Sequence, residues 1–152
     1  MLDDAILQQL RSLYENLSAP LRLVYRPSSH AQQGELVDLL TQVAGTSPHL
    51  HAVEEGAPSD VPRFYLARED GATTGIAFIG IPGGHEFTSL VLAILNADGK
   101  GKLPDDAFQH RIRRLRGPVR VRTFMSLSCE NCPDVVQALN LMALLHLSLI
   151  HI

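Results

Sequence analysis

The chain has few aromatic residues and no long, purely apolar run, and both shortages exclude classes of function. Aromatic side chains make up 5% of the 152 residues. A nucleic-acid-binding surface normally adds aromatic platforms or a recognisable module to its basic residues, so we expect no nucleic-acid partner. The apolar run Leu139–Ile152 is about 14 residues long and contains Asn140 and Ser148, so it is too short and too polar to span a bilayer. We therefore expect no membrane association.

The beginning of the chain lacks a secretion signal, which would start with basic residues and continue as an unbroken apolar stretch. Here Asp3 and Asp4 come first. Apolar residues then recur at helical spacing: Ile6, Leu10, Leu13 and Leu17. This pattern predicts an amphipathic helix within Met1–Pro20. We expect a cytoplasmic protein, in which a close cysteine pair is more often catalytic than a structural staple.

Nucleotide-binding motifs are also missing. Gly80–Gly84 (GIPGG) is glycine-rich but lacks the GxGxxG or GxxxxGK spacing that brings several backbone amides onto phosphate. A tight turn before a helix is the better interpretation. We expect no FAD or nicotinamide site in this chain.

Only two cysteines are present, Cys129 and Cys132, in the run FMSLSCENCPD. A structural zinc site usually takes four ligands, from two such pairs or from one pair and two spaced histidines. No second pair exists, and three histidines lack convincing ligand spacing: His110, His146 and His151. We expect no bound metal.

The cysteine pair is better explained as a redox dithiol. A strand predicted over 119–127 gives way here to a helix, so Cys129 is expected to meet unpaired backbone N–H groups and the positive end of the helix dipole. That environment favours the thiolate and makes Cys129 the expected nucleophile, with Cys132 more shielded. Two inert buried thiols are the alternative, but Ser126 and Ser128 make the surroundings polar.

The sequence contains an internal repeat. Ala19–Gly45 and Gly117–Ala143 share a plan of proline, alternating strand, polar loop and amphipathic helix. Matching residues are 98 apart in the strands, as Pro20 and Pro118 are, and 99 apart in the helices. The repeat favours two copies of one βα unit, although short patterns of this kind also recur by chance.

The first copy is predicted to complete itself before the second begins. The expected strands and helix are His51–Glu54, Arg63–Arg68, Thr74–Ile79 and His85–Leu95. This order is the thioredoxin arrangement, a mixed sheet with helices on its faces. That fold uses a cis proline before its third strand, so we expect a cis Val61–Pro62 bond. Ser28–Ala31 stands where the dithiol would be, so the first copy lacks the chemistry.

Charge is unevenly distributed. Residues 1–99 carry a net charge of −7 and residues 100–152 carry +4, with six arginines between Arg111 and Arg122. We interpret the arginines as the solvated face of a short helix. Its buried stripe is predicted to be Phe108, Ile112 and Leu115.

Two segments carry a family resemblance. Gly84–Asn96 (GHEFTSLVLAILN) and Ser126–Ala143 (SLSCENCPDVVQALNLMA) closely resemble the N-terminal region of the flavoprotein subunit of bacterial alkyl hydroperoxide reductase. The resemblance runs from Met1 to about Leu145. In that family, two tandem thioredoxin-like folds, the first without cysteines and the second with a CxxC pair, precede a reductase body that binds FAD and a nicotinamide.

The resemblance implies an α/β protein of tandem thioredoxin-like folds. Residues 1–100 would form the first fold, complete and without cysteines. Residues 101–146 would begin the second, which is truncated after its βα unit. Residues 147–152 depart from the family pattern, and we expect them to be a non-native tail.

The resemblance also implies an electron relay for peroxide detoxification. NADH reduces FAD, a second cysteine pair in the body follows, and the dithiol of Cys129 and Cys132 then reduces a peroxiredoxin, the peroxidase component of the same reductase. FAD and NADH belong to the full-length protein, expected to be a homodimer. Glu86 matches an acidic residue near the family's dithiol and would tune its protons. Alternatively, Glu86 is a first-turn acid favoured by the helix dipole.

A second function class stays open. The chain would then be a free-standing thioredoxin-like module that binds a peroxiredoxin-like partner without competent turnover. Half of the second fold, including its proline loop, is missing from the sequence, so we expect the isolated fragment not to be competent as an enzyme.

Overall fold

The structure is a computed structural model that describes residues 2–146 and 148–152. The chain divides into two compact units. One contains the residues up to Thr73 together with Phe78–Ile81, and the other contains Thr74–Ala77 and Pro82–Ile152. Strand β4, Thr73–Ile79, contributes residues to both units.

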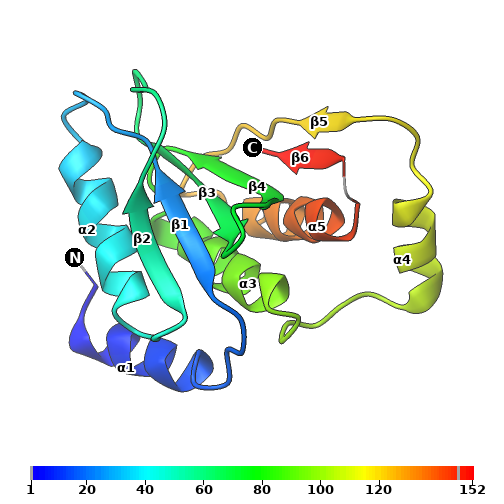
Figure 1. The fold of residues 1–152 in the computed structure, drawn as a ribbon, viewed down its shortest axis with the longest axis horizontal. Helices are drawn as coiled ribbons and strands as arrows, with labels where there is room; N and C mark the ends of the chain where they lie inside the picture. Colours follow the sequence, from blue (N-terminus) through cyan, green and yellow to red (C-terminus); the bar gives the residue numbers. More distant parts are fainter. Residues whose placement is uncertain (1, 147) are drawn as a thin grey trace. The chain divides into compact units, whose positions relative to one another are not determined.

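The first unit is built around strand β1. Its elements are α1 (Asp4–Leu13), β1 (Leu21–Tyr25), α2 (Gln33–Ala44), β2 (Leu50–Glu54) and β3 (Arg63–Arg68). β1 pairs in parallel with β2 and antiparallel with β3, and α2 packs against β1 and β2 (Figure 1). The predicted N-terminal helix is confirmed as α1. It starts where Asp3 accepts a hydrogen bond from the backbone N–H of Ile6, a standard N-cap.

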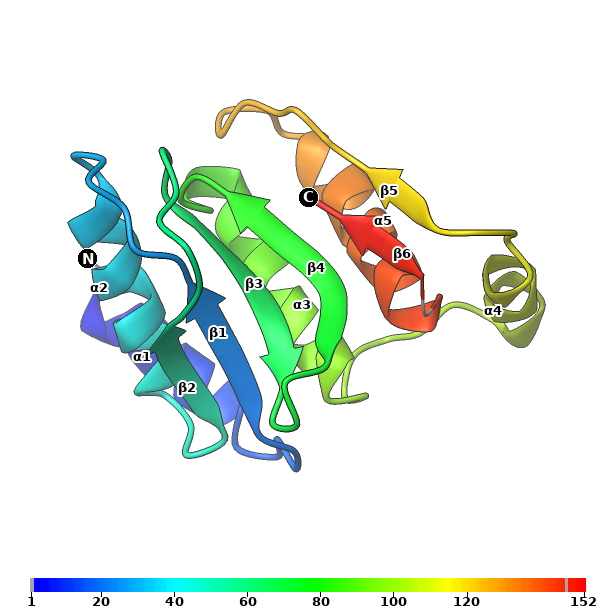
Figure 2. The ribbon, with the colours of Figure 1, turned by 45° about the horizontal axis from the view of Figure 1, so that its top comes forward.

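The second unit holds the cysteines. Its elements are the Thr74–Ala77 part of β4, the 3₁₀ turn η1 (Gly84–Glu86), α3 (Phe87–Ala97), α4 (Asp106–Arg113), β5 (Val119–Val121), α5 (Cys132–Leu145) and β6 (Leu149–His151). β6 lies between β4 and β5 and pairs in parallel with both. α5 packs against β6 and α3 (Figure 2). The two sulfur-bearing residues therefore lie at one end of a helix that packs against the sheet.

The predicted repeat is visible in the element boundaries. β5 begins 98 residues after β1, and α5 begins 99 residues after α2. The pairing register also repeats, because Leu21 faces Leu50 and Val119 faces Leu149 in their parallel pairs. The second copy thus reaches its second strand, β6, within the described residues.

The compact units do not follow the repeat boundary expected near residue 100. η1 and α3, which end the first copy in chain order, pack with α5 in the second unit. Helix α3 is buried along much of its length, and its inward residues include Leu90 and Ile94. Its apolar face therefore supports the helix that carries the dithiol.

The structure corrects three expectations. The strand predicted over 119–127 is only Val119–Val121, although the backbone N–H of Thr123 still donates to the carbonyl oxygen of Ile152, and a turn follows at residues 127–128. No cis peptide bond occurs within residues 2–146 and 148–152, so the Val61–Pro62 bond is trans. Of the predicted buried stripe on α4, Ile112 is buried, whereas Phe108 is 55% and Leu115 41% exposed.

The expected tail has a structural role in this chain. Leu147 lies outside the described residues, but Leu149–His151 form β6. Its non-native origin stays a prediction. Among the described residues, no helix is both long enough and apolar enough to cross a membrane.

Candidate dithiol site

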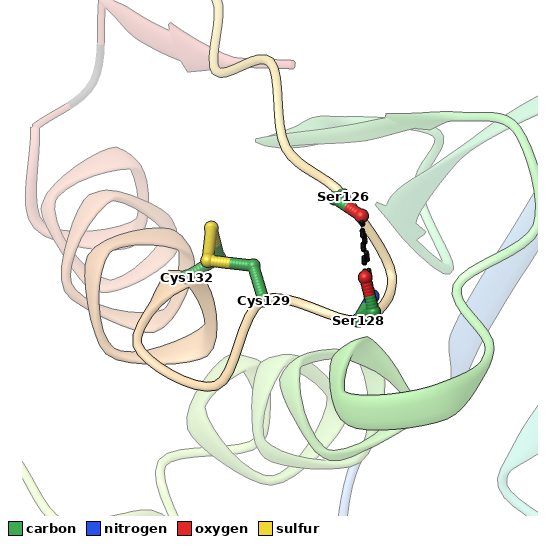
Figure 3. The surroundings of a disulfide bond; sticks show 4 residues. All are labelled: Ser126, Ser128, Cys129 and Cys132. Atoms are coloured by element: carbon green, nitrogen blue, oxygen red, sulfur yellow. Dashed lines mark hydrogen bonds between the residues drawn. A yellow bond between two sulfur atoms is a disulfide. The ribbon is translucent and has the colours of Figure 1, made fainter.

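Cys129 and Cys132 form a disulfide at the start of α5 (Figure 3). The sequence suggests that Cys129 opens the helix. In the structure the helix begins at Cys132, and Cys129 lies in the preceding loop. The disulfide nevertheless holds the sulfur of Cys129 at the helix N-terminus. Asn131 makes no capping hydrogen bond through its side chain there. The dipole argument for a stabilised thiolate therefore still applies to both sulfurs.

Exposure does not separate the two cysteines. Both are half-buried, and the expected greater shielding of Cys132 stays a prediction. Their order along the chain still separates them. Cys132 lies in the first turn of α5, and Cys129 lies in the loop before it.

The loop before Cys129 is held mostly by its own polar groups. The backbone N–H of Cys129 donates to the carbonyl oxygen of Ser126 at 3.0 Å, and the hydroxyls of Ser126 and Ser128 are hydrogen-bonded at 2.9 Å (Figure 3). Phe124, in the same loop, is 90% exposed and Leu127 is 48% exposed. The site thus offers a polar turn with apolar side chains beside it.

Glu86 is fully buried in the second unit, with 0% exposure. It is the N-cap residue of α3 but makes no capping hydrogen bond, and neither carboxylate oxygen has a partner among the described residues. η1, which contains Glu86, packs against α5. The adjacent Gly84 lies so close to Leu127 that a Cβ there would be 2.9 Å from the Leu127 carbonyl oxygen. Glu86 therefore lies in a segment that contacts both the dithiol loop and the dithiol helix.

A buried polar network, which the sequence did not indicate, joins α5, β6 and the segment after β5. The His151 ring contacts the Asn140 amide oxygen through Nδ1 at 2.7 Å and the Thr123 hydroxyl through Nε2 at 2.8 Å. His151 is 2% and Asn140 1% exposed. Burial lowers the pKa of His151. Sequence reasoning considered this histidine only as a metal ligand, because no local pattern links residues 123, 140 and 151.

Nothing in the described residues suggests a metal or nucleotide site. No three histidine, cysteine, aspartate or glutamate side chains gather in that part of the chain. Gly80–Gly84 leads into η1, which has only three residues, and Gly84 lies against the Leu127 backbone. The absence of a nucleotide site in this chain stays a prediction.

Solved structures define the class of the protein. The chain is similar to the NTD_N/C domain of alkylhydroperoxide reductase AhpF from Enterococcus faecalis, with a TM-score of 0.90 and 27% identity over 99% of this chain and 78% of that one. A protein disulfide oxidoreductase from Aeropyrum pernix shares the fold, with a TM-score of 0.78 and 19% identity over 99% of this chain and 75% of that one. The predicted thioredoxin-like α/β class is confirmed.

The curated relatives that the chain resembles share one name. The F subunit of alkyl hydroperoxide reductase in Staphylococcus aureus is 40% identical over 99% of the chain, and its counterpart in Pseudomonas putida is 41% identical over 100%. The resemblance to the N-terminal domain of this flavoprotein, AhpF, is confirmed. The chain spans 29% of the length of these relatives. No family model matches it.

Proposed function

We propose that the chain is the dithiol domain of an NADH-dependent alkyl hydroperoxide reductase and acts as a thiol–disulfide oxidoreductase. The observation that carries the proposal is the Cys129–Cys132 disulfide at the N-terminus of α5, within a thioredoxin-like unit. A helix N-terminus stabilises the thiolate that attacks a disulfide or leaves from one. The proposed partner is a peroxiredoxin, the peroxidase component of the same reductase.

The exchange proceeds through a mixed disulfide. The Cys129 thiolate attacks one sulfur of the partner disulfide, forming a bond between proteins and releasing the partner's other sulfur as a thiolate. The Cys132 thiolate then attacks Cys129, closing the intramolecular disulfide and releasing the second partner thiolate. Two electrons pass to the partner, whose thiolates take up protons from solvent.

A dithiol elsewhere in the longer protein would restore the reduced state by the reverse exchange. In the full-length protein, that dithiol belongs to the reductase body that uses FAD and NADH. The steps proposed for this chain involve only its own two sulfurs and those of its partners. We further propose that the full-length protein is a cytoplasmic homodimer.

Glu86 is proposed to exchange protons with the dithiol. A buried carboxyl group without a hydrogen-bond partner is costly, so its presence in a segment that contacts the dithiol loop favours a role in proton transfer over a role in packing. Both oxygens of Glu86 meet this description. The absence of a capping bond favours this role over a purely structural cap.

The alternative, a module that binds its partner without turnover, depends on the second thioredoxin-like fold being incomplete in this chain. β1 is paired on both sides, by β2 and β3, whereas its counterpart β5 pairs only with β6 among the described residues. No counterpart of β3 lies beside β5 among the described residues. The fragment would then bind its partner but turn over poorly.

The test uses the full-length protein with two serine variants. Cys132→Ser should trap a mixed disulfide between Cys129 and the peroxiredoxin, visible on non-reducing gels, whereas Cys129→Ser should trap none. Both should lose peroxide reduction while flavin reduction by NADH persists. Peroxide turnover that survives in either variant would place the relay elsewhere. The 152-residue chain, pre-reduced, tests the alternative: partner binding without partner reduction would support the module.

A further inference from the structure

His151 connects the two segments that carry the sulfurs. Thr123, whose hydroxyl contacts Nε2, lies six residues before Cys129, and Asn140, which contacts Nδ1, lies on the helix that begins at Cys132. A backbone bond strengthens the first contact, since the N–H of Thr123 donates to the carbonyl oxygen of Ile152 at 2.9 Å. The ring thus bridges the entry of the dithiol loop and the dithiol helix.

The chemistry of the three side chains fixes the direction of each bond. The amide oxygen of Asn140 can only accept, so Nδ1 of His151 donates to it. In the neutral ring, Nε2 then accepts from the hydroxyl of Thr123. Burial lowers the pKa of His151, which keeps the ring neutral. Both ring nitrogens are then bonded, while Nδ2 of Asn140 is buried without a partner. Two bonds from one ring to two segments suit a role in holding those segments in register.

The first copy of the repeat lacks this network. The matched strand pairs place Ala52 opposite Leu23, where the second copy has His151 opposite Val121. The repeat offsets place Tyr25 and Thr41 at the positions of Thr123 and Asn140. An alanine methyl group has no polar atom with which to bridge them. The network occurs in the copy with the dithiol and not in the copy without it.

We propose that His151 is a positioning residue for the dithiol, holding the loop that ends in Cys129 against the helix that begins at Cys132. This inference rests on the proposed redox function. While the disulfide is closed, the S–S bond itself joins loop and helix. After reduction, the bridge from Thr123 through His151 to Asn140 remains, and it keeps the two thiols within reach of each other.

The bridge should make ring closure more favourable. Two thiols held close together form a disulfide more readily than two that separate, because less freedom is lost on closure. Loss of the bridge should therefore make the disulfide easier to reduce and the reduced dithiol a weaker reductant. It should also slow the attack of Cys132 on a mixed disulfide. The inference concerns His151 in this chain as it stands, whatever the origin of residues 147–152.

The experiment measures the equilibrium between the dithiol and glutathione in the 152-residue chain, by trapping thiols at defined ratios of reduced to oxidised glutathione. Thr123→Val keeps the side-chain shape but removes the hydroxyl, whereas Thr123→Ser keeps it. His151→Gln removes the double bridge. His146→Gln is the matched control: His146 is also a buried histidine of the second unit, but its Nε2 contacts the carbonyl oxygen of Leu115.

We expect the equilibrium constant for disulfide formation to fall about tenfold in Thr123→Val and His151→Gln, equivalent to about 30 mV in the reduction potential. Thr123→Ser and His146→Gln should stay near the wild-type value. Urea unfolding gives the unfolding free energy of each variant, which shows whether a change in the disulfide equilibrium simply follows a loss of stability. His146→Gln should lower stability without moving the equilibrium, and Thr123→Val should move the equilibrium even if stability changes little.

Two results would overturn the inference in different ways. If the wild-type disulfide forms and opens reversibly but Thr123→Val matches the wild type, His151 does not position the dithiol and the redox function is unaffected. If the shifts simply follow the loss of stability across all variants, including His146→Gln, the role is structural only. A wild-type chain that never exchanges with glutathione would refute the redox function and this inference together.

Discussion

Replacing Gly75 with alanine tests whether β6 is a true strand of the second unit. Gly75 lies in β4 with φ of 83°, a left-handed conformation that costs an L-residue about 1 to 2 kcal/mol. An added Cβ would overlap the carbonyl oxygen of Leu149 at the start of β6 and would lie 3.3 Å from the Cβ of Ala143 in α5. Because the first obstacle is backbone, β6 itself would have to move.

The expected cost follows from these two effects. Overpacking in a well-packed interior costs about 1 to 3 kcal/mol, so Gly75→Ala should destabilise the second unit by about 2 to 5 kcal/mol in all. Gly71→Ala is the matched control, because Gly71 has φ of 82° but no atom within 4 Å of an added Cβ. It should cost only about 1 to 2 kcal/mol. The smaller freedom of alanine in the unfolded chain affects both variants alike and cancels in the comparison.

Hydrogen exchange and urea unfolding measure the difference. Amides that β5 and β6 share, such as those of Val119 and Ile152, should lose protection in Gly75→Ala and keep it in Gly71→Ala. The unfolding free energy should fall by more in the first variant. Equal losses in the two variants would show that β6 does not approach β4 as closely as the structure indicates, and the strand order of the second unit would need revision.

Three further predictions follow from the same contacts. Glu86→Gln should shift the pH dependence of thiolate absorbance near 240 nm while stability is kept or raised, because a buried carboxyl without a partner is replaced by a neutral amide; an unchanged profile would leave Glu86 no part in the chemistry. Burial lowers the pKa of His151 from 6.5, so below that pH the unfolded chain binds a proton more readily than the folded unit does. The unfolding free energy should therefore decline as pH falls through about 6.5, and His151→Gln should remove that part of the decline. Hydrogen exchange in the wild type should show stronger protection over residues 20–95 than over 118–152, since β5 and β6 have three residues each and the outer edge of β5 has no partner in the described chain; similar protection would contradict this.

The elements that local chemistry controls could be predicted from the sequence. Acidic residues before a helical stripe predicted α1, and Asp3 does cap it. The alternating pattern predicted a strand that starts at Val119, as β5 does, and helical periodicity predicted a helix after the cysteines, although α5 begins at Cys132 and not at Cys129. The spacing of Cys129 and Cys132 allowed a disulfide, since two residues between cysteines keep their sulfurs within reach at a helix start.

Features that depend on distant neighbours were set by tertiary packing. Pairing across the sheet made Leu149–His151 the strand β6, and β5 extends only as far as it pairs with this short strand. Packing of η1 against α5 buried Glu86 without a partner, although its position in the sequence equally suited a solvated cap. The contacts of His151 with Thr123 and Asn140 join residues 28 and 11 positions away, and no periodicity records such a meeting. Local sequence patterns determine where helices and strands form. The surroundings of the dithiol are determined by burial and long-range hydrogen bonds, which depend on the surfaces that come together when the chain folds.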